Sequence, residues 1–228
     1  MNRETAVAAD RDRPAFGLTT DVVIFTIRED ALCVLLVNRS REPFAGVWAL
    51  PGGFLGPDEA LNDGAARVLA EKTGVSGVFL EQLFTFGGPA RDPRGRVVSV
   101  AYYALVPYNR LDRMAAVEGD RVAWVAVDEL PELAFDHGEI VRMAHQRLAA
   151  KLDYSTIALQ FMPERFTLSE LQSVYETILG EQLDKRNFRK RLRTFECIEE
   201  TGEMFRAGKH RPAKLFRMKQ PGTVEIIK

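Results

Sequence analysis

Hydrophobic residues follow two kinds of spacing along the chain, and the change of spacing marks its organisation. The first half contains short runs rich in β-branched residues, bounded by polar or turn residues, at 22–26, 33–37, 97–106 and 122–127. Such runs are typical of strands. Apolar residues at helical spacing follow at 140–148, and from Tyr154 onward compact helices replace the strands. The pattern predicts an α+β protein in two parts, divided near residue 152.

Residues with known preferences for helix ends predict the helices of the first part. After Pro51-Gly52-Gly53, Asp58 is expected to cap a helix that closes at Gly74, a suitable residue for the left-handed position after a helix. Asp136 with Glu139 three residues later resembles a capping box, and its helix is expected to run to about Leu152.

The second part has stronger start and stop signals. Thr167 and Glu170 form a capping box, and the helix they begin is expected to end at Gly180. After a short link, Asp184 is expected to cap a second helix that covers 185–195. Two helices joined by a tight link are typical of a helix-turn-helix.

This second helix combines an apolar face with dense positive charge. Phe188, Leu192 and Phe195 are spaced i, i+4 and i+7 and are expected to share one buried face. Six of the nine residues from 185 to 193 are basic and none is acidic. A solvated helix face is the alternative interpretation, but the lack of acidic neighbours favours contact with double-stranded DNA. The residues expected to contact DNA are Lys185, Arg186, Asn187, Arg189, Lys190 and Arg193.

Beyond the basic helix, short strands are expected at 197–199, 203–206 and 214–218, around a tip at 207–212. The tip carries Lys209, His210 and Arg211, which are expected to reach DNA phosphates as a wing does. The C-terminal part is therefore predicted to be a winged helix-turn-helix DNA-binding domain.

Composition narrows the cellular setting. The 228 residues carry 31 basic and 32 acidic side chains, so any affinity for a polyanion must come from uneven distribution of charge. Cys33 and Cys197 are far apart, which argues against a disulfide framework and suits a reducing cytoplasm. Residues 1–18 are polar, no segment has the apolar length of a membrane span, and we expect a cytoplasmic protein with a flexible tail and no membrane partner.

A motif for phosphate chemistry lies between the two central strand regions. Gly53, Glu59, Arg67, Glu71 and Gly74, with the aliphatic residues at 69 and 75, follow the spacing G-x5-E-x7-R-E-U-x-E-E-x-G-U, where U is aliphatic. This pattern resembles the Nudix box. The resemblance implies an N-terminal Nudix-type α/β/α sandwich that binds an effector at 19–152, followed by the winged helix-turn-helix at 153–228.

The box departs from the family at the positions that hold metal. Nudix hydrolases use Glu residues at i, i+3 and i+4 to hold divalent cations, which polarise a pyrophosphate. Here these positions are Val68, Glu71 and Lys72. Two of three carboxylates are missing, so we expect a degenerate box with no metal, no catalytic residue and little or no hydrolysis. Glu59, Arg67 and Glu71 then either support the loop as an internal network or retain weak contact with metal or phosphate.

A second stretch bears on the ligand. Residues 84–99 resemble the corresponding segment of Nudix members that recognise ADP-ribose, which implies ADP-ribose as effector and no cofactor. Arginines can bind phosphate oxygens in a forked geometry, and an aromatic ring can stack on adenine. The candidates are Arg39, Arg41, Phe86, Arg91, Arg94 and Arg96. A solvated surface charge is the alternative for each arginine.

Taken with Thr167–Gln172 and Asp184–Lys190, the two predicted domains resemble the Nudix-related transcriptional regulators of NAD metabolism, the NrtR-like family. The resemblance implies a homodimer that represses genes of NAD biosynthesis or salvage and releases its operator when ADP-ribose binds. Two alternatives remain: an active ADP-ribose pyrophosphatase with an added basic domain, and a Nudix-family repressor that senses a sugar.

Overall fold

The computed structural model describes residues 15–111, 121–206 and 212–227. Within them, the chain forms ten strands, four α-helices and three short 3-10 helices. The elements are β1 (Gly17–Arg28), β2 (Ala31–Asn38), β3 (Trp48–Ala49), β4 (Gly52–Phe54), α1 (Leu61–Thr73), β5 (Phe79–Phe86), β6 (Val97–Leu105), a 3-10 helix (Tyr108–Arg110), β7 (Arg121–Ala126), a 3-10 helix (Val127–Glu129), α2 (His137–Tyr154), a 3-10 helix (Ile157–Phe161), β8 (Phe166–Thr167), α3 (Leu168–Leu179), α4 (Lys185–Leu192), β9 (Ile198–Phe205) and β10 (Ala213–Met218).

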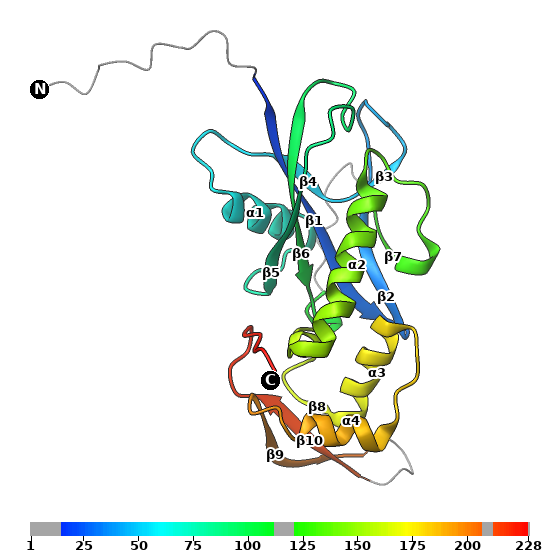
Figure 1. Ribbon diagram of the computed structural model, residues 1–228, viewed down its shortest axis with the longest axis vertical. Coiled ribbons are helices and arrows are strands. Elements are labelled where there is room, and N and C mark those ends of the chain that lie inside the picture. The colour runs from blue at the N-terminus through cyan, green and yellow to red at the C-terminus, as the bar shows by residue number, and fades with distance from the viewer. Residues whose placement is uncertain (1–14, 112–120, 207–211, 228) are drawn as a thin grey trace, which may run out of the picture.

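A mixed seven-stranded sheet forms the first part, in the order β3-β2-β1-β6-β5, with β4 paired to β1 and β7 paired to β2. β1 and β6 are parallel, and the other pairs are antiparallel. Successive β1 side chains point to opposite faces. Val22 and Ile24 pack in the cluster that contains α1, and Val23 and Phe25 pack in the cluster that contains α2. The sheet therefore lies between two helices as an α/β/α sandwich (Figure 1).

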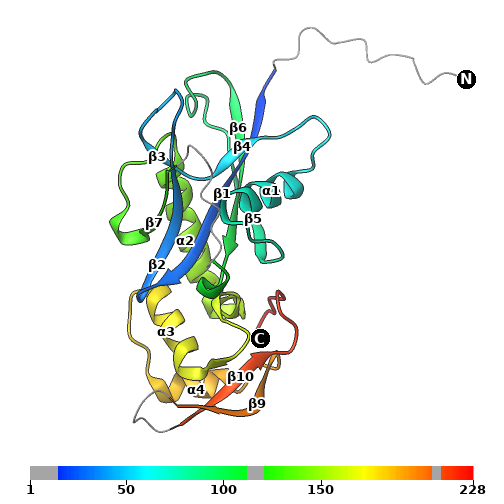
Figure 2. The same ribbon diagram turned by 180° about the vertical axis from the view of Figure 1, so that it is seen from behind.

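The second part consists of α3, α4 and a three-stranded sheet in the order β8-β10-β9. It lies beyond the C-terminal end of α2 (Figures 1 and 2). One hydrophobic cluster runs from the α2 face of the large sheet into this part and includes Leu148, Leu159, Leu171 and Phe188. The two cores are thus divided by the large sheet, not by the boundary between the two parts. None of the helices that the structure describes is long and apolar enough to cross a membrane.

Several expectations about helix and strand ends need correction. Asp58 does not cap α1, which begins at Leu61 after Ala60 and has no side-chain cap. Asp136 precedes α2 but its carboxylate does not cap the helix, which runs on to Tyr154. The expected strands at 197–199 and 203–206 are one strand, β9, which continues through Gly202. β5 and the two- and three-residue strands β3, β4 and β8 were not predicted, because their formation depends on pairing with distant strands.

Three of the four helix ends in the second part agree with the sequence, whereas α4 ends at Leu192 and not at the expected residue 195. Thr167 and Glu170 form a reciprocal capping box, and Gly180 adopts the left-handed conformation at the end of α3. The Asp184 side chain caps α4 by accepting a hydrogen bond from the Asn187 backbone. Of the predicted tail 1–18, residues 1–14 lie outside the described part, whereas Gly17 and Leu18 already belong to β1. The predicted division after residue 152 falls two residues before the end of α2.

Candidate functional site

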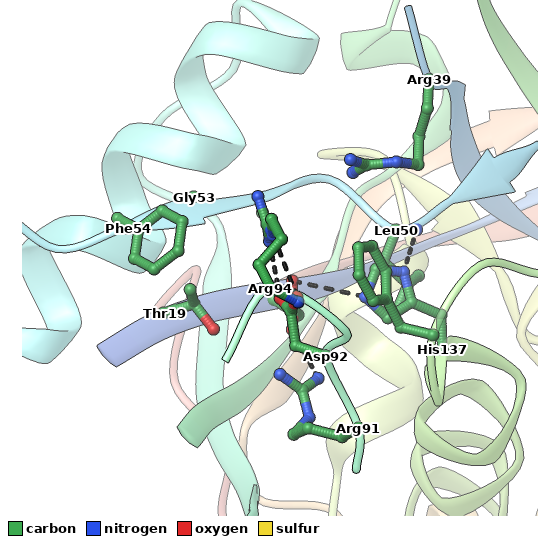
Figure 3. A pocket seen from close by; sticks show the side chains of 12 residues that line it. Thr19, Arg39, Leu50, Gly53, Phe54, Arg91, Asp92, Arg94 and His137 are labelled. Carbon is green, nitrogen blue, oxygen red and sulfur yellow. Dashed lines mark hydrogen bonds and ion pairs between the residues drawn. The ribbon is translucent and has the colours of Figure 1, made fainter. Parts of the chain in front are cut away.

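A small polar pocket opens between the β5–β6 connection, β4 and the start of α2 (Figure 3). Its volume of about 170 Å³ is below the roughly 300–1,000 Å³ of sites that enclose a whole small molecule. It therefore has room for part of a nucleotide, such as a diphosphate. The lining residues are Thr19, Asp21, Arg39, Leu50, Gly52, Gly53, Phe54, Arg91, Asp92, Arg94, Phe135 and His137.

Arg91 is the most enclosed cation of the pocket, with 5% of its side chain exposed. Its Nε and one terminal nitrogen donate to the two carboxylate oxygens of Asp136 at 2.7 and 2.6 Å. The same terminal nitrogen lies 3.4 Å from Asp21, whose carboxylate also accepts from the Ser99 hydroxyl at 2.6 Å. Burial disfavours the charged guanidinium, but the hydrogen bonds and negative charges of Asp136 and Asp21 together outweigh it and raise the pKa of Arg91. Arg91 is thus a fixed cation shared by two carboxylates.

Arg94 is also paired with a carboxylate, but it faces solvent. It donates to both oxygens of Asp92, at 2.9 and 2.6 Å, and these bonds lower the pKa of the buried Asp92. The Arg94 guanidinium carbon lies 5.4 Å from the ring centre of Phe54 and 5.7 Å from that of Phe135. Arginine and two aromatic rings thus form one side of the pocket.

Arg39 differs from the other two pocket arginines in its partners. It donates to the backbone carbonyls of Pro43 at 2.8 Å and Arg41 at 3.4 Å, and it lies 4.8 Å from the centre of the Phe135 ring. Burial and the nearby charge of Arg94 lower the pKa of Arg39. Since none of its partners among the described residues is a carboxylate, its charge is the least directly neutralised of the three.

His137 closes the inner wall of the pocket as a neutral side chain. Its Nδ1 accepts the Leu50 backbone N–H at 2.8 Å, which requires this nitrogen to be unprotonated. Burial lowers the pKa of His137, although Asp21 lies 3.7 Å from its Nε2. Gly52 lies against the same aspartate: a Cβ atom there would be 2.1 Å from the Asp21 carboxylate. Gly52, directly before the first glycine of the Nudix box, therefore allows the backbone to approach Asp21.

The structure brings together three of the predicted effector-binding residues, Arg39, Arg91 and Arg94. The other three do not line the pocket. Phe86 is buried in the core, and Arg96 donates to the Gly87 carbonyl. Arg41 meets the pocket arginines only through its backbone carbonyl. Sequence reasoning missed the pocket residues Asp21, Phe54, Asp92, Phe135 and His137, and also Asp136, which binds Arg91. An aspartate inside an apolar strand was a usable signal for Asp21.

The retained residues of the Nudix box form an ionic network beside the pocket. Both carboxylate oxygens of Glu59 accept from Arg67, at 2.7 and 3.0 Å, and one also accepts the Gly56 backbone N–H at 3.0 Å. The hydrogen bonds from Arg67, and to a smaller extent the one from the Gly56 backbone, lower the pKa of Glu59 to about 2. Arg67 also lies 3.3 Å from Glu71. The network connects the loop before α1 to the helix itself.

The residues of the box do not fit a catalytic magnesium site. Val68 is 2% exposed and packs in the α1 core, so its position supplies no ligand. Glu59 already has both oxygens bound to Arg67, and Lys72 places an amine where the family pattern has a carboxylate. Within the described residues, no three His, Cys, Asp or Glu side chains are grouped so that they could hold a metal ion. Magnesium requires oxygen ligands in near-octahedral order, and this set does not provide them.

The second candidate site is the outer face of α4. Lys185, Arg186, Asn187, Arg189, Lys190 and Arg193 are all exposed, while Phe188, Leu192 and Phe195 are buried. None of these five cations forms an ion pair with another described residue. The turn before α4 is held by α3: Gln172 donates to the Leu183 carbonyl, and Glu176 accepts the Leu183 N–H. The helix thus presents unpaired charge on a fixed support.

A groove of about 940 Å³ runs between α4 and the strands β9 and β10. Lys185, Arg189 and Arg193 line one side. On the other side, the cation Lys214 is paired with Glu200 at 2.8 Å, so free positive charge is concentrated on α4. The predicted wing-tip residues Lys209, His210 and Arg211 lie outside the described residues.

Two family models match the chain, one in each of its two parts. Residues 17–144 match the NUDIX domain, and residues 158–218 match the NrtR DNA-binding winged helix domain. The chain is 40% identical over 210 residues to the ADPR responsive transcriptional repressor NtrR of Acinetobacter baylyi, covering 90% of this chain and 83% of that protein.

Solved structures agree with these matches. Shewanella oneidensis NrtR, crystallised in complex with a 27mer DNA, has a TM-score of 0.81 and 41% identity, covering 89% of this chain and 93% of that chain. The NUDIX domain of the same protein, crystallised with ADP ribose, has a TM-score of 0.53 and 41% identity, covering 61% and 92%. The chain therefore belongs to the NrtR family of transcriptional regulators, in which a Nudix domain is joined to a DNA-binding winged helix domain.

Proposed function

We propose that this protein is a transcriptional repressor that binds operator DNA through α4 and the wing, and that ADP-ribose bound by the Nudix domain releases it. The observation that carries the proposal is the exposed, unpaired charge of α4 on a buried aromatic face. A DNA-bound structure and an ADP-ribose-bound domain exist for the Shewanella relative, and the Acinetobacter relative is named as ADPR responsive. Genes of NAD biosynthesis or salvage are the proposed targets, and a homodimer is the proposed assembly.

The proposed DNA contacts follow from side-chain chemistry. Arg186, Arg189 and Arg193 can bind either a phosphate or, through two hydrogen bonds, a guanine; Asn187 can pair with adenine, and Lys190 suits a phosphate. Lys185 extends the positive surface of α4. Lys209, His210 and Arg211 of the predicted tip are proposed to contact the DNA phosphates. The proposed division of labour is an effector domain at 19–152 and a DNA-binding domain at 153–228.

The proposed ligand contacts centre on the diphosphate. Arg39 and Arg94 can bind phosphate oxygens from two sides of the pocket, while Arg91 adds a fixed charge behind them (Figure 3). Phe54, which is 50% exposed beside Arg94, offers a ring face for the adenine, whereas the buried Phe86 does not. The pocket arginines favour a nucleotide diphosphate over an uncharged sugar.

We further propose that the protein does not hydrolyse ADP-ribose with magnesium. Support comes from the buried Val68 and from Glu59, whose carboxylate oxygens are both bound to Arg67. The test is release of AMP from ADP-ribose with magnesium or manganese, measured by chromatography. Metal-dependent turnover that a Glu59→Gln variant loses would make the protein a hydrolase and overturn this part of the proposal.

The decisive experiment for the repressor is fluorescence anisotropy with DNA from upstream of NAD-metabolism genes, over a range of salt concentrations. We expect tight binding that weakens with salt and is reversed by ADP-ribose, but not by AMP, ribose 5-phosphate or free sugars at equal concentration. Binding that is independent of DNA sequence, or that persists at saturating ADP-ribose, would contradict the proposal. Release by a sugar alone would favour a sugar-sensing repressor.

A further inference from the structure

Among the basic residues at 185–193, in α4 and directly after it, Arg191 is the one that points into the protein. It is half-buried, and its guanidinium donates to the backbone carbonyls of Leu152 and Asp153, the latter at 2.9 Å. The guanidinium carbon also lies 5.5 Å from the centre of the Tyr175 ring, which packs on Phe188 at 5.0 Å. Arg191 therefore joins the end of α2 to both helices of the DNA-binding domain.

The contact completes the C-terminal end of α2. The last four carbonyls of a helix have no partner within the helix and carry partial negative charge. Here the Lys151 carbonyl accepts from Ser155, and the Tyr154 carbonyl accepts from Ile227 at 2.7 Å. The two carbonyls between them are bound by Arg191. A charged group from the DNA-binding helix thus forms the cap of an effector-domain helix.

The opposite end of α2 forms part of the pocket. Asp136, directly before the helix, holds Arg91 through two hydrogen bonds, and His137, its first residue, accepts from Leu50. Between the two ends, Ile140, Ala144 and Leu148 are fully buried. The 18 residues span about 27 Å at 1.5 Å per residue, from the pocket to α4 (Figure 1).

We infer that Arg191 is a positioning residue that fixes α4 to α2, and that α2 transmits the occupancy of the pocket to α4. This inference rests on the proposed function. The negative charge of a bound diphosphate weakens the hold of Arg91 on Asp136, which changes the restraint on the first turn of α2. Because α2 is packed along its length, the change reaches its C-terminal carbonyls, and Arg191 carries it into the orientation of α4. Arg191 itself makes no contact with DNA.

The test compares Arg191→Gln with Arg193→Gln, two losses of one positive charge in the same segment. Operator affinity is measured against salt and with or without ADP-ribose. For R193Q we expect a shallower salt dependence, by about 0.9 log units per log salt, and an unchanged ADP-ribose effect. For R191Q we expect an unchanged salt dependence and an ADP-ribose effect reduced at least fivefold. R191K keeps the charge but lacks the forked geometry, and we expect it to resemble R191Q.

A second measurement needs neither DNA nor ligand. Hydrogen exchange of the free protein is expected to rise in R191Q at both 149–156 and 185–193, and to stay unchanged at 61–73. Unchanged exchange in these two segments, or a salt dependence reduced as in R193Q, would overturn the positioning role. Raised exchange with a full ADP-ribose effect would overturn transmission through α2. If ADP-ribose does not release operator DNA from the wild-type protein, the proposed function is refuted. Hydrogen exchange still tests whether Arg191 fixes α4 to α2 in that case.

Discussion

Two sets of arginines in this protein have opposite environments. In the pocket, Arg91 and Arg94 are bound to Asp136 and Asp92, and Arg91 is almost completely buried. Of the cations between 185 and 193, all but Arg191 are exposed, and the side chains of these five have no hydrogen-bond partner among the described residues. The same type of side chain is held in place in one domain and left free in the other.

The difference follows from what each set is proposed to bind. A single small anion is bound well by charges whose positions are fixed beforehand, because little side-chain freedom is lost on binding. Duplex DNA presents a continuous row of phosphates, and unpaired cations gain affinity by releasing its counterions. The paired arginines thus make ligand binding in the pocket selective. The exposed cations make DNA binding by α4 strong and dependent on salt.

The largest expected effect comes from breaking the pairing at its most buried point. Arg91→Gln leaves Asp136 and Asp21 without their shared cation, and loss of one partner of a buried ion pair costs about 3–5 kcal/mol of the free energy of unfolding. Urea denaturation measures this loss. Adding Asp136→Asn should recover part of it, because one unpaired carboxylate is removed. As a control, Arg142→Gln, at a position 63% exposed, should change stability by less than about 0.5 kcal/mol.

Removing exposed charge is expected to give the opposite result. The triple variant Arg186→Gln, Arg189→Gln, Lys190→Gln should fold with unchanged stability, since all three side chains are exposed. Its operator affinity should fall about 100-fold near 0.15 M salt, and its salt dependence should decrease by about 2.7 log units per log salt, if each residue neutralises one phosphate. Anisotropy titrations at several salt concentrations measure both. An unchanged affinity would show that α4 is only a solvated face.

Arg39 is intermediate between the two sets, because it lies in the pocket but has no described carboxylate partner. Arg39→Gln should weaken ADP-ribose binding about 10- to 150-fold, the value of a hydrogen bond to a charged group, without the stability loss of R91Q. Isothermal titration calorimetry measures the affinity. Arg96→Gln is the matched control outside the pocket, and a comparable loss there would restore Arg96 to the ligand site.

Interactions within a few residues of each other could be predicted from the sequence. Thr167 with Glu170, and Asp184 with Asn187, cap their helices because each partner is three residues away. The aromatic face of α4 follows in the same way from helical spacing. Composition and spacing thus predict the second domain better than the first, where long-range strand pairing decides which short segments become strands.

The pocket could not be predicted in the same way, because distant residues compete for its side chains. Asp136 has the position of a helix cap, but Arg91, 45 residues earlier, binds both of its oxygens. Arg191 belongs to a basic run by sequence, yet the carbonyls at the end of α2 draw it inward. In both cases a local preference gives way to a hydrogen-bond partner that only the folded chain brings near.

Arg67 separates the effect of pairing from that of burial, since it is bound to Glu59 but is 39% exposed. The pKa of Glu59 is lowered from its ordinary 4.5 to about 2, so the folded state favours the ionised form of this carboxylate. The stabilisation is complete above about pH 4.5 and is lost as the pH falls toward 2. Glu59→Gln should therefore lower the free energy of unfolding at pH 7, by less than R91Q does, and the difference from wild type should shrink steadily below pH 4.5. Urea denaturation at pH 7, 4 and 3 measures it, and a difference that does not change with pH would show that the carboxylate charge contributes nothing to this network.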